Sequence, residues 1–202
     1  MVTKKSTPTW SDVKTKLTDF DRAGHHLAND LQRTEAICHE IAVTFGQGRK
    51  VLVLTERTEH LDAILAGLTG KVPSVFVLHG RMSKKQRAAV IKELDALPPD
   101  SPRILLATGK LVGAGFDHPP LDTLVLAMPV SCKGMLQQYA GRLHREHATK
   151  TDVRIVDFVD SGHPAAANVG QAATRIQGDG LQNRKPIRTG WTGVRGITQW
   201  LK

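Results

Sequence analysis

Three side chains between residues 137 and 146 have types and a spacing that suit phosphate binding. Within the stretch QQYAGRLHRE they are Gln138, Arg142 and Arg145. Residues three and four apart are neighbours on a helix, so in a helix these side chains share one face. A guanidinium group presents a rigid fork of donors that matches phosphate oxygens, and it stays charged at any relevant pH. Two interpretations follow: an ordinary solvated face or a phosphate-binding face.

The composition favours an anionic partner. The 202 residues carry a formal net charge of +9, and residues 161–202 hold six Lys/Arg against one Asp. Such an excess of positive charge suggests nucleic acid. The two cysteines, Cys38 and Cys132, form no CxxC pair or zinc-type cluster, and no run of 18 apolar residues occurs. We therefore expect a cytoplasmic protein that contacts no membrane.

Apolar runs alternate with amphipathic segments through the middle of the chain. This pattern predicts strands at residues 51–55, 74–80, 103–108, 122–129 and 153–160. It predicts helices at residues 27–45, 58–68, 83–97 (with Ser83 as N-cap) and 132–146. Strands that are apolar throughout are typical of a parallel sheet covered on both faces. The expected fold is therefore α/β, with a doubly wound, mostly parallel sheet.

The same patterns divide the chain into three regions. Residues 1–26 are expected to form an N-terminal helical extension, because apolar residues recur there at spacings of three and four. Residues 27–160 form the α/β domain. Residues 161–202 are rich in glycine and arginine and show little periodicity, which predicts a basic, poorly ordered tail.

The remaining candidate residues follow the ends of the predicted strands, where open α/β sheets bind ligands. The glycine-rich stretch ATGKLVGAGFD at 107–117 could bring backbone amides close to a ligand. It is no Walker A loop, since GxxxxGK[ST] occurs nowhere in the chain, and DExH, DExD and GxGxxG are also missing. The last of these absences disfavours a dinucleotide-dependent oxidoreductase.

Metal binding and thiol chemistry are less favoured. His79, His118 and His144 belong to separate predicted elements without a matching carboxylate spacing, so polar loop histidines are the better interpretation. Cys132 begins the arginine-bearing helix but has no evident general base. We predict no metal site and a structural role for this cysteine.

Four stretches together resemble a known family. In chain order they are VLVLTERTEHLDAI, VFVLHGRMSKKQR, ILLATGKLVGAGFDHPPLDTLVLAMP and QYAGRLHRE. They are similar to the second RecA-like domain, the helicase C-terminal domain, of superfamily 2 DEAD/DEAH-type helicases. The last stretch resembles motif VI, QxxGRxxR, and AT…GFD resembles motif V. The resemblance covers about residues 27–160 and implies a RecA-like fold of the P-loop NTPase type, without a P-loop of its own.

The resemblance also implies roles for individual residues. Arg142 and Arg145 would be catalytic arginine fingers, with Gln138 organising the site, and Gly115 and Asp117 would join the two arginines in contacting the nucleotide. The nucleic-acid backbone would be contacted by residues at the strand ends: Thr55, Arg57, His79, Gly80, Arg81, Thr108 and Gly109. ATP with Mg²⁺ would bind only with a separate RecA-like ATPase domain that supplies Walker A and Walker B.

Two departures from the family pattern keep other functions open. Ala114 stands where relatives often carry Glu, and the sequence contains no first RecA-like domain. We expect helicase-type ATP hydrolysis only as half of a split site, on either DNA or RNA. The alternatives are a non-catalytic module that binds nucleic acid or a partner, and an inert gene remnant.

Overall fold

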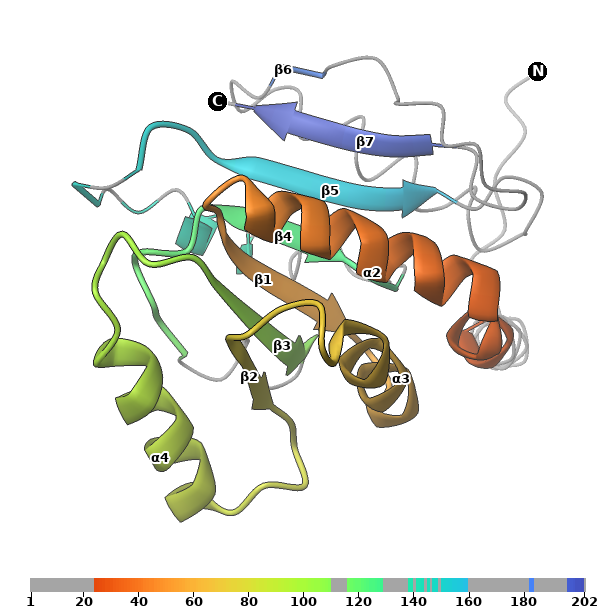
Figure 1. Cartoon of the computed structure of the whole chain (residues 1–202), viewed down its shortest axis with the longest axis horizontal. Helices are drawn as coiled ribbons and strands as arrows, with labels where there is room; N and C mark the ends of the chain where they lie inside the picture. The colour runs from red at the N-terminus through yellow and green to blue at the C-terminus, as the bar shows by residue number, and fades with distance from the viewer. Residues whose placement is uncertain are drawn as a thin grey trace, which may run out of the picture.

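One mixed β-sheet forms the centre of the protein. The computed structural model describes residues 24–109, 116–128, 138–139, 141–143, 145, 147–148, 150–159, 182–183 and 196–201. Its helices are α2 (Leu31–Gly46), α3 (Thr58–Leu68) and α4 (Lys84–Asp95). Its strands are β1 (Lys50–Thr55), β2 (Val75–Leu78), β3 (Arg103–Thr108), β4 (Thr123–Leu126), β5 (Arg154–Val159), β6 (Gln182–Asn183) and β7 (Gly196–Leu201). The strand order is β2-β3-β1-β4-β5-β7-β6 (Figure 1).

Five neighbouring strands, in the spatial order β2-β3-β1-β4-β5, run parallel to one another. β1 pairs with β3 from Lys50↔Arg103 to Thr55↔Thr108. Every residue of β1, β3 and β4 is buried, as expected for strands whose two faces are both covered. The predicted doubly wound, mostly parallel α/β fold is confirmed.

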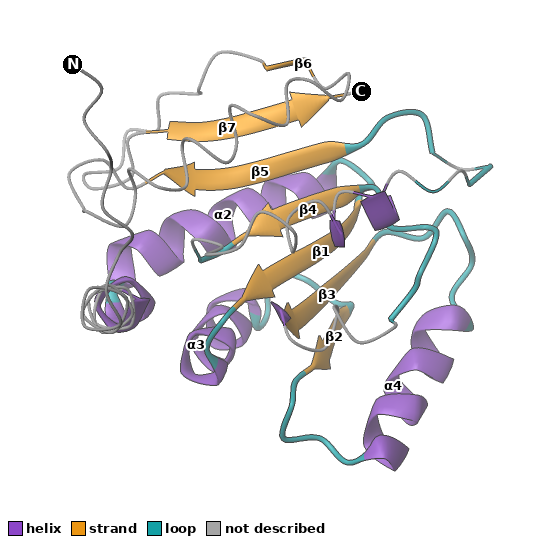
Figure 2. Cartoon of the chain, turned by 180° about the vertical axis from the view of Figure 1, so that it is seen from behind, coloured by secondary structure: helices purple, strands orange, loops and turns teal. Residues whose placement is uncertain are grey.

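The two faces of the sheet carry separate hydrophobic cores, because successive side chains of a strand point in opposite directions. Val51 and Val53 of β1 belong to the core beneath α2 and α3. Leu52 and Leu54 belong to the other core, which also contains Leu94 of α4. Figure 2 shows α2 and α3 together behind the strands, so both helices cover the first face.

Asp30 divides the first predicted helix. Residues 24–29 are helical, Asp30 is extended, and α2 begins at the next residue. The Asp30 carboxylate accepts a hydrogen bond from the backbone N–H of Arg33 at 3.1 Å, which is the usual geometry of an N-cap. The prediction of one continuous helix over 27–45 was therefore wrong, because a capping side chain starts a new helix inside that range.

The other predicted elements lie close to the observed ones. α3 occupies residues 58–68 as predicted. Ser83 caps α4 as predicted: its side chain accepts from the N–H of Gln86, and the Gln86 side chain accepts from the N–H of Ser83. The predicted strands at 74–80 and 122–129 were too long, since β2 and β4 have four residues each.

The C-terminal region adds two strands that the sequence analysis did not predict. β7 pairs antiparallel with β5, from Arg154↔Leu201 to Val159↔Gly196, and β6 pairs antiparallel with β7. β7 thereby covers the edge that β5 would otherwise present unpaired. Most of 161–202 and of 1–26 lies outside the described residues, so the disordered tail and the helical extension stay predictions. No described helix is both long and apolar enough to span a membrane.

Candidate functional site

The carboxyl ends of the parallel strands gather the predicted nucleic-acid contacts at one edge of the sheet. Thr55 ends β1 and is in register with Thr108, which ends β3. Leu78 at the end of β2 is in register with Ala107, so the next residue, His79, follows the strand at the same edge. The carboxyl edge is defined here by the seven predicted residues that follow or end these three strands: Thr55, Arg57, His79, Gly80, Arg81, Thr108 and Gly109.

The two threonines of the carboxyl edge are buried. Thr55 and Thr108 are 3% and 8% exposed, and the Thr55 hydroxyl oxygen lies 3.1 Å from Nδ1 of His60. Thr55 also accepts a hydrogen bond from the N–H of Arg57 at 3.4 Å. Burial and, to a lesser extent, the charge of Arg33 lower the pKa of His60 to about 3, so this histidine is neutral. The two threonine side chains therefore support the carboxyl edge from the protein interior.

The part of the carboxyl edge that a ligand can reach is basic. Gly80 and Arg81 are exposed, and Arg57 and His79 are half-buried. Nδ1 of His79 is buried and has no hydrogen-bond partner in the described part of the chain. Arg57 lies 3.9 Å from the exposed carboxylate of Glu59, a separation that leaves a weak ion pair.

The two arginines meet the segment that precedes β4. Nη1 of Arg142 donates to the carbonyl oxygen of Phe116 at 2.6 Å, and Arg145 forms an ion pair with Asp117. The Arg145 and Asp117 side chains are 58% and 36% exposed. The structure thus brings together three of the residues predicted to contact nucleotide. Their roles stay predictions, and Gly115 lies outside the described residues.

Tyr139, which the sequence analysis did not single out, connects the same two segments. Its buried hydroxyl donates to the carbonyl oxygen of Gly109 at 2.6 Å. Burial, assisted by the charge of Glu56, raises the pKa of Tyr139 to about 12, so the hydroxyl keeps its proton. Tyr139 at Gly109 and Arg142 at Phe116 therefore hold the residues on either side of segment 110–115.

A cavity beneath these contacts is too small for a nucleotide. Its volume is about 10 Å³, which is room for roughly one water molecule. The predicted nucleotide contacts of Asp117 and Arg145 would therefore form at the surface, where both side chains are exposed. The cavity is lined by Leu52, Phe116, Asp117, His118, Leu121, Tyr139, Arg142 and Leu143.

Lys150 fixes the end of the arginine-bearing segment. Its Nζ donates to the carbonyl oxygens of Leu143 and Arg145, at 2.7 and 2.9 Å. Burial lowers the pKa of Lys150, and the charges of Asp122 and Asp117 oppose this shift. A lysine shortly after a helix commonly binds its last carbonyls, so the position of Lys150 was a signal that sequence reasoning could have used.

The other predicted residues are only partly placed. Gln138 is helical and exposed, and it stays a candidate. His79 lies at the carboxyl edge, whereas His118 contacts Arg103 at the start of β3, the opposite edge. His144 is outside the described residues. Among the residues that are described, no three His, Cys, Asp or Glu side chains lie close enough to hold a metal ion.

Comparisons with known proteins show which family this chain resembles. The family "Helicase conserved C-terminal domain" matches residues 32–147. Transcript termination protein A18 of Fowlpox virus is 32% identical over 137 residues, which cover 67% of this chain and 29% of the viral protein. Probable helicase D10 of Escherichia phage T5 is 25% identical over 139 residues, covering 67% of this chain and 30% of the phage protein. The matches thus span less than a third of these relatives' length.

Solved structures support the fold. T4 UvsW matches with a TM-score of 0.61 and 14% identity, over 79% of this chain and 35% of the other. S. cerevisiae Dbp5 bound to RNA and ADP BeF3 matches with a TM-score of 0.57 and 18% identity, over 72% and 36%. These neighbours share the RecA-like architecture of helicase C-terminal domains, which confirms the predicted resemblance. Because the family match covers more than half of the sequence, this chain belongs to the helicase conserved C-terminal domain family.

Proposed function

We propose that this chain works as the C-terminal RecA-like half of an ATP-dependent superfamily 2 helicase. In this role Arg142 and Arg145 are arginine fingers, Gln138 helps to organise their site, and the carboxyl edge contacts nucleic-acid backbone. ATP and Mg²⁺ are held chiefly by a separate RecA-like domain, because the 202 residues contain no Walker A or Walker B sequence. Without that domain the chain is inactive as an ATPase.

The observation that carries this proposal is the meeting of Arg142 and Arg145 with residues 116–117. The contacts join positions 26 and 28 residues apart in sequence, and these are the two stretches that resemble motifs VI and V. The Phe116 carbonyl orients the guanidinium of Arg142. An oriented, permanently charged donor is what stabilises negative charge during phosphoryl transfer.

Arg145 can exchange its protein partner for a phosphate. Its ion pair with Asp117 is exposed on both sides, and such pairs contribute only about 0–1 kcal/mol. A phosphate group carries more negative charge than one carboxylate and accepts both prongs of the guanidinium fork. The cost of leaving Asp117 is therefore small compared with the gain at a phosphoryl group.

The residues of this chain fit a phosphate group and only part of an ATP site. Two guanidinium groups can bind phosphate oxygens, and Asp117 can accept from a hydroxyl or orient Arg145. ATP, once bound with Mg²⁺, supplies the phosphoryl group that is transferred to water. This chain adds positive charge at that group.

The nucleic-acid role rests on the accessible residues of the carboxyl edge. Gly80 and Arg81 are exposed, and glycine lets a phosphate backbone come close to the protein backbone. Arg57 and His79 follow β1 and β2 at the same edge of the sheet and are half-buried. The Dbp5 neighbour was solved with RNA bound, which supports a nucleic-acid contact without deciding between RNA and DNA.

The catalytic part is tested by supplying a RecA-like ATPase domain with Walker A and Walker B in trans. We expect ATP hydrolysis to rise when this chain is added, and Arg145→Ala to reduce the gain about a thousandfold or more. Lys92→Ala, an exposed charge on α4, is the matched control and should keep the full gain. Rapid turnover by this chain alone, unaffected by Arg142→Ala and Arg145→Ala, would contradict the proposal.

The nucleic-acid part is tested by titrating single-stranded and duplex DNA and RNA at several salt concentrations. Phosphate contacts make affinity fall steeply with salt, and Arg81→Ala should weaken binding to all sequences and reduce the logarithmic salt slope by about one. Binding without any ATPase gain would favour a non-catalytic binding module. Neither binding nor gain would favour an inert remnant.

A further inference from the structure

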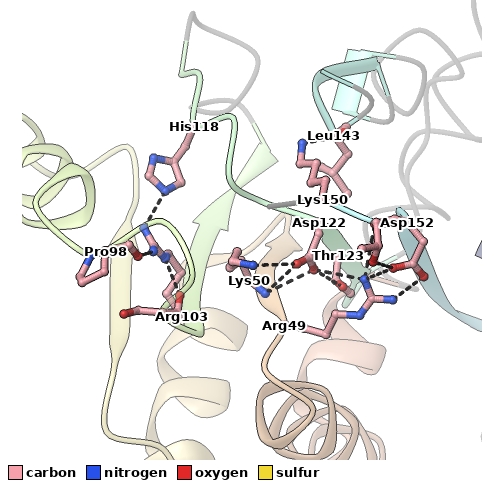
Figure 3. A network of polar contacts seen from close by, with 12 residues as sticks. Arg49, Lys50, Pro98, Arg103, His118, Asp122, Thr123, Leu143, Lys150 and Asp152 are labelled. Atoms are coloured by element: carbon pink, nitrogen blue, oxygen red, sulfur yellow. Dashed lines mark hydrogen bonds and ion pairs between the residues drawn. The ribbon is translucent and has the colours of Figure 1, made fainter. Parts of the chain in front are cut away.

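His118 lies in a polar network on the amino side of the sheet (Figure 3), in which the Asp95 side chain is 58% exposed. The His118 side chain is 4% exposed. Nδ1 of His118 lies 2.9 Å from a carboxylate oxygen of Asp95, at the end of α4. Nε2 lies 3.2 Å from Nη1 of Arg103, the first residue of β3. One imidazole therefore links a carboxylate and a guanidinium group.

The chemistry of these partners fixes the protonation state of the ring. A guanidinium group has donors only, so Nε2 must accept from Arg103. A carboxylate has acceptors only, so Nδ1 must carry the proton and donate it to Asp95. His118 is therefore neutral, with its proton on Nδ1. A charged imidazole has two donors and would lose the bond to Arg103.

Arg103 makes a rigid partner, because the protein holds it in several directions. The residue is fully buried, and its guanidinium donates to the carbonyl oxygens of Ser101, Leu94 and Pro98. A donor fixed in this way cannot follow the histidine if the ring moves. The Arg103–His118 bond thus depends on where His118 lies and on its charge.

His118 directly follows the two residues that hold the arginines. The Phe116 carbonyl accepts from Arg142, and Asp117 pairs with Arg145. The Phe116 ring is stacked near the imidazole, with centroids 6.4 Å apart. Whatever anchors His118 therefore sets the position of the backbone and carboxylate that both arginines contact.

We infer that His118 is a positioning residue, which in its neutral Nδ1–H form anchors residues 116–117 against the two arginines and releases them when its ring is protonated. The anchor itself stands on the contacts described above. Its consequence for catalysis, a loss of arginine positioning in acid, rests on the function proposed for Arg142 and Arg145.

The direction of the pH effect follows from the groups around the ring. Burial is the largest influence and lowers the pKa of His118, and the charges of Arg103 and His147 lower it further. The hydrogen bond and charge of Asp95 act in the opposite direction. A lowered pKa means that the anchor is complete above the ordinary value of 6.5 and is lost as the pH falls through the lower value in the folded protein.

Nuclear magnetic resonance of the imidazole nitrogens tests the anchor on the full chain without nucleotide. One of the nine histidines, identified by the loss of its signals in His118→Gln, should show the Nδ1–H form at neutral pH and resist protonation. Asp95→Asn should move its titration to lower pH. A His118 ring that is charged at neutral pH, or protonated on Nε2, would overturn the proposal.

Hydrogen exchange of the amide that bonds to His118 tests the release. The Leu121 N–H donates to the His118 carbonyl at 3.2 Å, so its protection factor reports on this segment. From about pH 7.5 to about pH 4.5 we expect protection to fall about tenfold or more in the natural chain. His118→Gln keeps an acceptor for Arg103 without titrating, and its protection should stay constant.

The control variant makes both outcomes of the exchange test informative. Equal pH dependence in the natural chain and in His118→Gln would overturn the release, because the effect would then come from another group. Neither the resonance nor the exchange measurement involves ATP. A negative result in these two measurements would not contradict the ATPase role proposed for Arg145. A negative result in the ATPase test with Arg145→Ala would not contradict the anchoring role of His118.

Discussion

Two arginine–aspartate pairs in this molecule use the same chemistry in opposite ways. Arg49 binds Asp152 through two hydrogen bonds of 2.6 Å each, and its side chain is only 12% exposed. Arg145 contacts Asp117 through one nitrogen, and its side chain is 58% exposed. The first arginine has both prongs of its fork fixed on one carboxylate. The second keeps most of its donors in solvent.

The surroundings of the two pairs explain the difference. Asp122, beside the first pair, is buried and lies 3.6 Å from Nζ of Lys50 and 3.7 Å from Arg49 (Figure 3). It also accepts from the hydroxyl of Thr123 at 2.8 Å. We call Arg49, Lys50, Asp122 and Asp152 the amino-edge network; it ties the start of β1 to the segments that enter β4 and β5. The charges of this network stabilise the fold, whereas those of the Arg145–Asp117 pair remain accessible to a ligand.

The largest effect is expected from Asp122→Ala. The substitution leaves Lys50 buried and Arg49 nearly so, without the carboxylate between them. Removing one partner of a buried charge pair typically costs about 3–5 kcal/mol. We expect the free energy of unfolding, measured by urea denaturation, to fall by about that amount without a change in the denaturant slope.

Asp117→Ala provides the matched control for that prediction. It removes the carboxylate of the exposed pair, and surface substitutions usually change stability by no more than about 0.5 kcal/mol. Similar losses in the two variants would show that the two pairs do not differ in the way their burial suggests.

An intermediate effect is expected from pH acting on Asp152. The hydrogen bonds from Arg49 are the main cause that lowers the pKa of this carboxyl, against an opposing effect of burial. The stability it contributes is therefore present above the ordinary value of 3.8 and is lost as the pH falls through the lower value in the folded protein. Urea midpoints between about pH 5 and about pH 3 should fall less steeply in Asp152→Asn than in the natural chain. Equal slopes would mean that Arg49 does not hold the carboxylate ionised.

Local patterns were enough to predict most of the fold. The alternation of apolar strands and amphipathic helices located every element between β1 and β5, because each pattern reflects burial on one or two faces. A helix start was also predictable where one capping residue determines it, as Ser83 does for α4. The N-cap at Asp30 was missed because apolar residues on both sides of it continue a helical spacing. Only the capping hydrogen bond shows that the helix is interrupted there.

The candidate site was predictable only as a set of residues. The spacing of Arg142 and Arg145 and the ends of the strands pointed to segments that the structure brings into contact. The contacts that position them could not be found from spacing, since Tyr139 reaches Gly109 across 30 residues and His118 reaches Asp95 across 23. β7 was missed because it is held by long-range backbone pairing with β5, and the side-chain pattern of a strand predicts such pairing only weakly.

The smallest effects on stability are expected for the two residues of the exposed pair, and the effect at Arg145 is the one that makes its function testable. Arg145→Ala removes one exposed ion pair and leaves Asp117 in water, where it needs no partner. The free energy of unfolding should therefore change by less than about 1 kcal/mol, and urea denaturation measures this directly. A loss above about 2 kcal/mol would mean that the pair supports the fold, and the drop in ATPase gain would then reflect damage to the site. If stability is unchanged, the same drop belongs to the missing guanidinium itself, because the contacts of Phe116, Tyr139 and Lys150 that hold the segment do not involve the Arg145 side chain.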